Sequence, residues 1–456
     1  MKRYVMMGRF GLTDRMHIPM AADEIATRLE MIASGNQLGR GIGRALVDLT
    51  RLGVFPTELG LDLLILAAHV HASDTRISRA TESQDSWTRE IRLVVPVSDP
   101  ALWSAAARTI ARMLNFLTGD RWVIGFRARP RGFKIIVFRK PRRLVVHPFD
   151  SLALFSGGLD SLIGAIDLLE QRLTPLLVSH AGEGASSQAQ TNLFDSLKAY
   201  YRGRFFNRLR LFMSFPKDFV RGVASEDTTR GRSFLFFALG IFAGSGLEGT
   251  FTLRVPENGF IALNVPLDPL RLGALSTRTS HPFYIARWNE LLRILGIPGR
   301  VENPYWDKTK GEMVTGCANS ALLRQLISAS LSCSSPTKGR WRGRGTEHCG
   351  YCVPCLIRRA SLYAGLGGAP DPTPYSMPDL RAHALDTRRA EGQEVRSFQF
   401  AIERLRAKPS LANILIHKPG PLSDESPIHQ GILAEVYRRG LAEIAELVAG
   451  VRTKPR

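Results

Sequence analysis

The sequence predicts an α/β fold built on a doubly wound parallel sheet in the middle of a 456-residue chain. A short apolar run, Leu152–Phe155, ends at paired glycines and is followed by apolar residues at helical spacing over 162–169. Strand and helix patterns then alternate within residues 148–366, at 175–179, 234–242 and 250–255. Because such alternation is typical of parallel sheets, a ligand is expected at the carboxyl ends of the strands.

The residues before this sheet predict an N-terminal α+β domain over 1–145, which can serve to bind a partner. Its expected elements are helices at 22–33, 45–52 and 61–70, a strand at 90–97, a helix at 100–117, and strands at 122–126 and 134–138. The basic run Lys140–Arg143 marks the end of this domain.

The sheet itself belongs to a domain of residues 146–370. A proline-rich stretch, 368–374, separates this domain from a helical C-terminal region over 371–456. Within that region, residues 432–448 form the clearest amphipathic stretch.

The turn between the first central strand and its helix carries the most informative residues of the chain. They are Ser156, Gly157, Gly158, Leu159, Asp160 and Ser161. Glycines let the backbone approach an anion closely, and the first N–H groups of a helix lack intrahelical partners and point at the ligand. The serine hydroxyls add donors, and Asp160 can hold a Mg²⁺ that bridges phosphate oxygens. The turn therefore predicts a phosphate-binding loop, with an ordinary turn and a serine-capped helix as the alternative.

Four of the five cysteines stand at metal-ligand spacing. They are Cys333, Cys349, Cys352 and Cys355, and Cys317 lies outside the group. Two residues between successive cysteines let their thiolates converge on one ion, and a fourth from a separate segment closes a tetrahedral site. A closed site of this kind predicts structural zinc. An iron–sulfur cluster is the alternative, because the same run begins a ferredoxin pattern.

The order of these motifs resembles a known family. The glycine loop is similar to the SGGxDS signature of the PP-loop ATP pyrophosphatases, which have an adenine nucleotide alpha hydrolase-like fold. Together with Lys310–Glu312, Ser332–Cys333 and Cys349–Arg358, the loop resembles the QueC family of 7-cyano-7-deazaguanine synthases. Arg230–Ser233 is similar to the family's opening of a buried helix. The resemblance covers residues 148–366.

The resemblance implies an enzyme that uses ATP, Mg²⁺ and Zn²⁺. Its catalytic residues would be Asp160, Lys310 and Arg232. Mg²⁺ would lie near Asp160, and the two cationic side chains would neutralise the α phosphate and the leaving pyrophosphate. A carboxylate of a 7-deazaguanine would be adenylated, and an amine would then displace AMP to form an amide.

Two segments depart from the family. His180–Glu183 stands where the family carries Tyr-Gly-Gln-Arg, and the substrate-contact segment is replaced by one containing Glu257 and Asn258. These departures and the long N-terminal region favour the QatC-like branch, found in anti-phage defence, in which a partner protein supplies the amine. Ammonia as the amine, a tRNA-modifying enzyme, and a nucleotide-sensing scaffold without turnover remain the alternatives.

The amino-acid composition excludes fewer classes of function than the motifs do. The chain carries 61 Lys and Arg against 41 Asp and Glu, a net charge of +20, which attracts ATP, nucleic acid or an acidic protein. The run Lys338–Gly345 suits stacking on a base, and a solvated loop is equally consistent with it. No apolar stretch is long enough to predict a membrane span, and few cysteines at metal spacing suit the cytoplasm.

Overall fold

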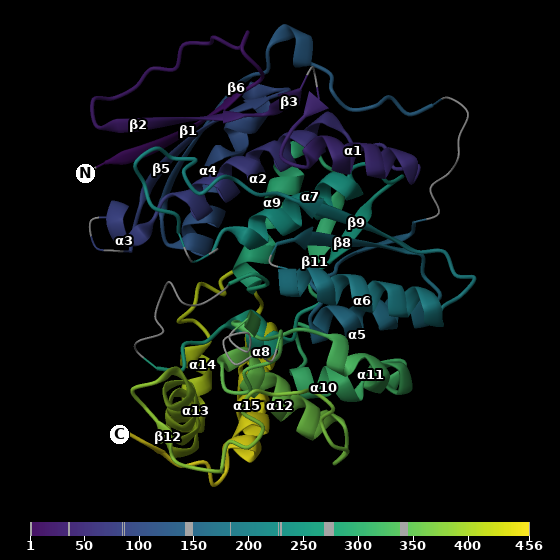
Figure 1. Ribbon diagram of the computed structural model, residues 1–456, viewed down its shortest axis with the longest axis vertical. Helices are drawn as coiled ribbons and strands as arrows, with labels where there is room; N and C mark the ends of the chain where they lie inside the picture. The colour runs from purple at the N-terminus through teal and green to yellow at the C-terminus, as the bar shows by residue number, and fades with distance from the viewer. Residues whose placement is uncertain are drawn as a thin grey trace.

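The computed structural model describes residues 2–34, 37–83, 85, 87–141, 149–182, 184–226, 228, 230–268, 278–337 and 345–455. Figure 1 shows these residues as stacked layers. An N-terminal sheet lies at the top of the view, and a helical layer separates it from a second sheet. Further helices cover the other side of the second sheet, and the C-terminal helices lie at the bottom.

The first sheet is wholly parallel, with the strand order β2-β1-β5-β6. Its strands are β1 (Arg3–Arg9), β2 (Glu24–Glu30), β5 (Glu90–Val97) and β6 (Arg121–Ala128). The accompanying elements are the ribbon β3 (Ile32–Ser34) and β4 (Gln37–Leu38) and the helices α1 (Ile42–Arg51), α2 (Glu58–Arg76), α3 (Arg79–Glu82) and α4 (Pro100–Thr118). Parallel strands need long connections, and those from β2 to β5 and from β5 to β6 contain helices, so this region is α/β. The predicted α+β arrangement is wrong, whereas β5 has the predicted bounds.

The helix predicted over residues 22–33 is also wrong. This segment forms β2 and β3. Its apolar residues Ile25, Leu29 and Met31 recur at even spacing, and all three pack into the core beneath the sheet. The alternation of a strand therefore decides which side chains are buried.

The strand predicted over residues 134–138 is absent from the structure. These residues follow a short 3-10 turn, η1 (Arg131–Phe133). The backbone N–H groups of Ile136 and Val137 donate to the Glu58 carboxylate at 2.6 and 2.9 Å. A side-chain acceptor at the start of α2 thus takes the place of a neighbouring strand.

The second sheet is the doubly wound parallel sheet that the sequence predicts. Its strand order is β11-β10-β7-β8-β9. The strands are β7 (Ser151–Leu154), β8 (Pro175–Ala181), β9 (Asn207–Phe212), β10 (Phe251–Arg254) and β11 (Gly299–Glu302). The strand order reverses between β7 and β10, and this reversal creates the crevice where open parallel sheets bind ligands.

Helices cover both faces of the second sheet. One face packs against α5 (Leu159–Glu170), α6 (Gly184–Tyr200), α10 (Lys310–Thr315), α11 (Ser320–Leu326) and α12 (Val353–Gly365). The other face packs against α7 (Arg232–Gly244) and α9 (Pro282–Leu295). The two faces differ because successive strand residues point to opposite sides.

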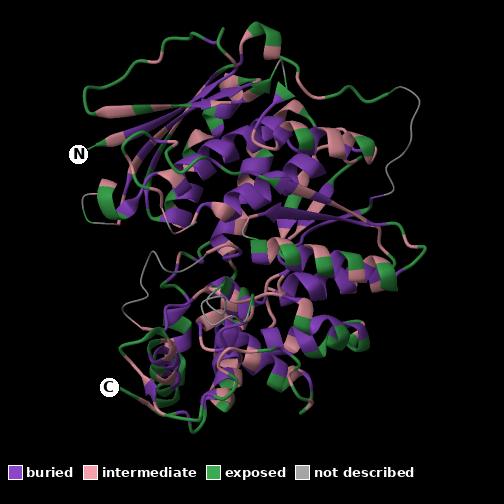
Figure 2. Ribbon diagram, viewed as in Figure 1, coloured by how far each residue is buried: buried purple, intermediate pink, exposed green. Residues whose placement is uncertain are grey.

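The two sheets share one helical layer. Helix α2 packs on α7, α4 packs on α9, and a single apolar cluster includes residues of both sheets. Trp103 of α4 and Trp288 of α9 are fully buried in this cluster. Figure 2 shows the buried residues running without interruption through the layer. The N-terminal region therefore forms part of the packing of the central sheet, and the end predicted for it near 140–145 lies partly outside the described residues.

The C-terminal region is mostly helical, as predicted, and packs around a second apolar cluster. Its elements are β12 (Leu385–Asp386), α13 (Ala390–Ala407), η5 (Pro409–Leu411), α14 (Ala412–Leu415), α15 (Pro427–Val448) and β13 (Thr453–Lys454). The short helix α8 (Gly259–Leu263) and α12 of the central domain contribute to the same cluster. Among the helices that the structure describes, none has the length and apolar content needed to cross a membrane.

Candidate functional site

The glycine loop joins β7 to α5 at the carboxyl edge of the second sheet. Gly157 has φ +82°, a left-handed conformation that favours glycine. Gly158 caps α5 without a side-chain hydrogen bond to the first turn of the helix. The Ser156 hydroxyl accepts from the Gly158 N–H at 3.3 Å and lies 3.1 Å from the Ser161 hydroxyl. The loop therefore presents hydroxyls and helix N–H groups together, as an anion site requires.

Two segments distant in sequence hold the loop in place. The buried Gln190 amide of α6 donates to the Ser156 carbonyl at 3.3 Å and to the His180 carbonyl at 3.2 Å. From the other side, the Leu331 N–H donates to the Gly157 carbonyl at 2.8 Å. A Cβ on Gly157 would lie 3.0 Å from the Gln190 backbone nitrogen, so a larger residue would displace the loop. The sequence pattern carries no signal for the role of Gln190.

Asp160, the first acidic residue of α5, contacts two other predicted site residues, Lys310 and Asn258. Its Oδ1 lies 2.9 Å from Nζ of Lys310, which is the first residue of α10. Its Oδ2 accepts from the side-chain amide of Asn258 at 2.7 Å and from the Asn258 backbone N–H at 3.2 Å. The structure thus brings a predicted cation, a predicted carboxylate and a predicted substrate residue to the reversal point of the sheet.

Glu257 adjoins this group and is partly buried. Burial raises the pKa of Glu257 to about 8, the negative charge of Asp160 adds to the rise, and the positive charge of Lys310 opposes it. The Ser280 hydroxyl donates to the Glu257 carboxylate. The Asn303 side chain donates to the Glu257 carbonyl at 2.7 Å and thereby fixes the segment after β10. A carboxyl group with a pKa near neutrality can exchange a proton under ordinary conditions.

Arg232 lies at a different part of the same edge, near the end of β8. Its Cζ is 5.7 Å from the centroid of the Phe236 ring, and a Cβ on Gly182 would lie 3.4 Å from its Nη2. The ring of His180 contacts the ring of His71, with centroids 5.5 Å apart. Burial lowers the pKa of His180 to about 3 and that of His71 to about 4, so both rings are neutral at pH 7. Helix α2 of the N-terminal region therefore reaches this edge of the central sheet.

The four grouped cysteines converge on one point. All four Sγ atoms lie within 4.8 Å of one another, with Cys333 to Cys352 and Cys349 to Cys355 at 3.9 Å. Zinc–sulfur bonds of about 2.3 Å in a regular tetrahedron place the sulfurs about 3.8 Å apart. The Cys349 N–H donates to Cys333 Sγ at 3.4 Å, and the Cys352 N–H donates to Cys349 Sγ at 3.3 Å. The donor set and its spacing therefore fit a metal such as zinc.

The cysteine group is linked to the glycine loop through the segment before Cys333. The Ser332 N–H donates to Nε2 of the buried His348 at 3.1 Å. The fully buried Arg358 of α12 donates to the Ser330 hydroxyl at 2.9 Å and to the Ile327 carbonyl at 2.7 Å. Leu331 in this segment contacts the glycine loop. A metal bound by the cysteines would therefore stabilise the loop through the segment that contains Leu331. His348 directly precedes Cys349 and is not one of the four residues of the group.

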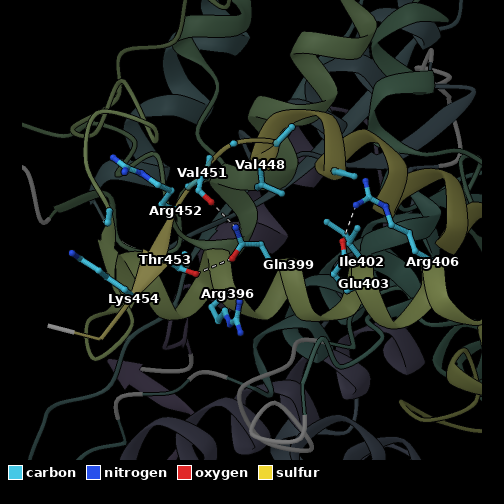
Figure 3. Close-up of a pocket in the computed structure, with 14 residues that line it drawn as sticks. Arg396, Gln399, Ile402, Glu403, Arg406, Val448, Val451, Arg452, Thr453 and Lys454 are labelled. Atoms are coloured by element: carbon cyan, nitrogen blue, oxygen red, sulfur yellow. Dashed lines mark hydrogen bonds and ion pairs between the residues drawn. The ribbon is translucent and has the colours of Figure 1, made fainter.

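A cavity of about 650 Å³ lies elsewhere, between α13 and the chain that follows α15. Figure 3 shows Gln399 at this cavity, where its amide donates to the Val451 carbonyl at 2.8 Å and its carbonyl accepts from the Thr453 hydroxyl at 2.9 Å. Of the residues described, those lining the cavity include no member of the glycine loop or the cysteine group. The basic run Lys338–Gly345 lies outside the described residues except for Gly345.

Comparisons with known proteins add nothing to these observations, because no protein-family model and no curated protein matches the chain.

Proposed function

We propose that the chain is a nucleotide-dependent enzyme of the PP-loop class, which cleaves ATP between its α and β phosphates. The observation that carries the proposal is the ion pair of Lys310 and Asp160 beside the glycine loop, at the reversal point of a parallel sheet. This arrangement combines an anion-binding helix terminus with a buried cation and a carboxylate. Within that class, the motifs favour a QueC-like ligase that acts on a 7-deazaguanine carboxylate.

In the proposed first step, a carboxylate oxygen of the substrate attacks the α phosphorus of ATP, and the bond to the β-phosphate oxygen breaks. Pyrophosphate leaves with the negative charge, which Lys310 and the N–H groups of the loop stabilise. Mg²⁺, when bound near Asp160, supplies further neutralisation of phosphate charge. Asn258 keeps the Asp160 carboxylate oriented through its side-chain amide at 2.7 Å.

In the proposed second step, an amine attacks the acyl carbon and AMP departs, so that an amide bond forms and the amine loses one proton. Glu257 lies beside Asp160 and Lys310 and has a pKa of about 8, so its ionised form, whose fraction grows as the pH rises towards 8, is the form that accepts this proton. We propose that the amine belongs to a partner protein, as in the QatC-like branch. The N-terminal layer outside the family resemblance supports this choice over free ammonia.

The test uses full-length protein with ATP, Mg²⁺ and 7-carboxy-7-deazaguanine, and it measures pyrophosphate release. We expect release by the wild type, loss of it in Asp160→Ala and Ser156→Ala, and wild-type rates in a control, Asp195→Ala, which changes an exposed carboxylate on α6. Binding of ATP without pyrophosphate release would instead support a nucleotide-sensing scaffold.

The acceptor requires a separate experiment. After co-expression with a partner protein, intact-mass spectrometry should detect a mass gain on the partner equal to one deazaguanine acyl group. An unchanged partner with free amide or nitrile in solution would assign ammonia as the amine. Retention of tRNA by the purified enzyme through a salt wash would favour the tRNA-modifying alternative, because binding driven by phosphate contacts weakens steeply with salt.

A further inference from the structure

Helix α15 of the C-terminal region contacts the turn that carries Lys310. The Thr309 hydroxyl donates to Oε1 of Glu443, and the Gly311 N–H donates to Oε2 of the same carboxylate at 3.3 Å. Thr309 is fully buried. A Cβ on Gly311 would lie 2.5 Å from the Glu443 carboxylate, so the glycine permits the close approach. One carboxylate therefore holds the residues on both sides of Lys310.

A second side chain of α15 also forms hydrogen bonds with this turn. Arg439, four residues before Glu443 and hence on the same face of the helix, donates to Oε1 of Glu312 at 2.6 Å and to the Asp307 carbonyl at 2.9 Å. Glu312 and Thr309 form a capping box at the start of α10. In that box the Thr309 oxygen accepts from the Glu312 N–H at 3.1 Å, while its proton goes to Glu443. The Thr309 hydroxyl thus donates one hydrogen bond and accepts another.

The geometry points to Glu443 as a positioning residue that fixes the turn and thereby aims Lys310 at Asp160. This inference rests on the proposed function for its catalytic consequence. Lys310 is buried, and its Nζ is 2.9 Å from Asp160, so the position of the turn determines where this buried cation lies relative to the carboxylate. Glu443 lies outside the segment that resembles the QueC family, and so the C-terminal region completes a site that the motifs alone leave unsupported.

The first test compares kcat and KM for ATP in full-length Glu443→Ala, with Glu446→Ala as a control because Glu446 is an exposed carboxylate on the same helix. We expect kcat to fall between about 10-fold and 100-fold in Glu443→Ala, because small misplacements of a catalytic group have effects of that size. The KM for ATP should change far less, and the control should match the wild type. Glu443→Gln, which keeps one carbonyl acceptor for Thr309, should recover part of the rate.

A double-mutant cycle separates positioning from a general loss of structure. If Glu443 acts through Lys310, then adding Glu443→Ala to a Lys310→Ala protein should cause no further loss of kcat. Additive losses, or an unchanged kcat in Glu443→Ala, would overturn the inference.

A readout without turnover keeps the inference testable if the proposed function fails. In the protein without nucleotide, the rate at which an amine-reactive reagent labels Lys310, measured by peptide mass spectrometry, should rise at least severalfold in Glu443→Ala and stay unchanged in Glu446→Ala. Equal labelling in the wild type and Glu443→Ala would contradict the positioning role whatever the reaction is.

Discussion

Replacement of one grouped cysteine tests the candidate metal site directly. Cys355 is fully buried in the first turn of α12, and its Sγ is 3.9 Å from that of Cys349. Cys355→Ser removes one of four thiolates that fit a tetrahedral ion, so metal affinity should collapse. A metal present at about 1,000 times its dissociation constant contributes about 4 kcal/mol to folding, and that contribution should be lost.

The size of the thermal shift follows from the length of the chain. An unfolding entropy of about 2 cal/mol/K per residue gives about 1 kcal/mol/K for this protein. The loss of about 4 kcal/mol should therefore lower the unfolding midpoint by about 4 °C. Because Leu331 joins the cysteine segment to Gly157, the variant should also bind ATP more weakly.

The assay combines elemental analysis with calorimetry, and the chain provides its own control. Cys317 is buried and lies outside the group, so Cys317→Ser should keep one zinc per chain while Cys355→Ser loses it. Full metal content and an unchanged midpoint in Cys355→Ser would refute the argument. A wild-type protein that is brown and contains iron would show that the four cysteines hold an iron–sulfur cluster and not zinc.

Three further outcomes follow from the same structure. Gly157→Ala should destabilise the protein and weaken ATP binding more than Gly158→Ala, because Gly157 has φ +82° and Gly158 has φ −85°; equal effects in binding and denaturation measurements would contradict this. In the folded protein, the Glu257 carboxyl group keeps its proton up to a pKa of about 8. The wild type should therefore lose stability relative to Glu257→Gln as the pH rises from about 4.5 to about 8. If urea titrations show a difference in stability that does not depend on pH, the pKa shift is excluded. A chain that begins at residue 146 should be insoluble on expression, because it exposes the faces of α7 and α9 that pack on α2 and α4; a soluble, folded fragment would show the layers to be separable.

The cysteine group was the most predictable part of the molecule. Three of its cysteines lie within seven residues, and their spacing alone brings the sulfur atoms together. The fourth, Cys333, was also expected, and the structure places its sulfur in the same group. The strands of the central sheet were similarly predictable, because short apolar runs bounded by glycine or proline have few alternative structures.

The errors in the N-terminal region have a common cause. Residues 22–33 carry apolar side chains that fit both a helical period and a strand period, and the neighbouring strand β1 decides between them. Residues 134–138 have strand-like composition, but the Glu58 carboxylate binds their N–H groups instead. In both cases the deciding partner lies far away in the sequence or on another element.

The sequence by itself determined the local chemistry of this protein: a glycine turn before a helix, and cysteines spaced for one ion. Only the tertiary structure decided which groups meet. Lys310 reaches Asp160 across 150 residues of chain, and Glu443 holds the turn of Lys310 from a helix beyond the family resemblance. Local spacing determines what a segment of a few residues can form, whereas contacts between distant segments depend on how whole layers pack, and that packing leaves no short pattern in the sequence.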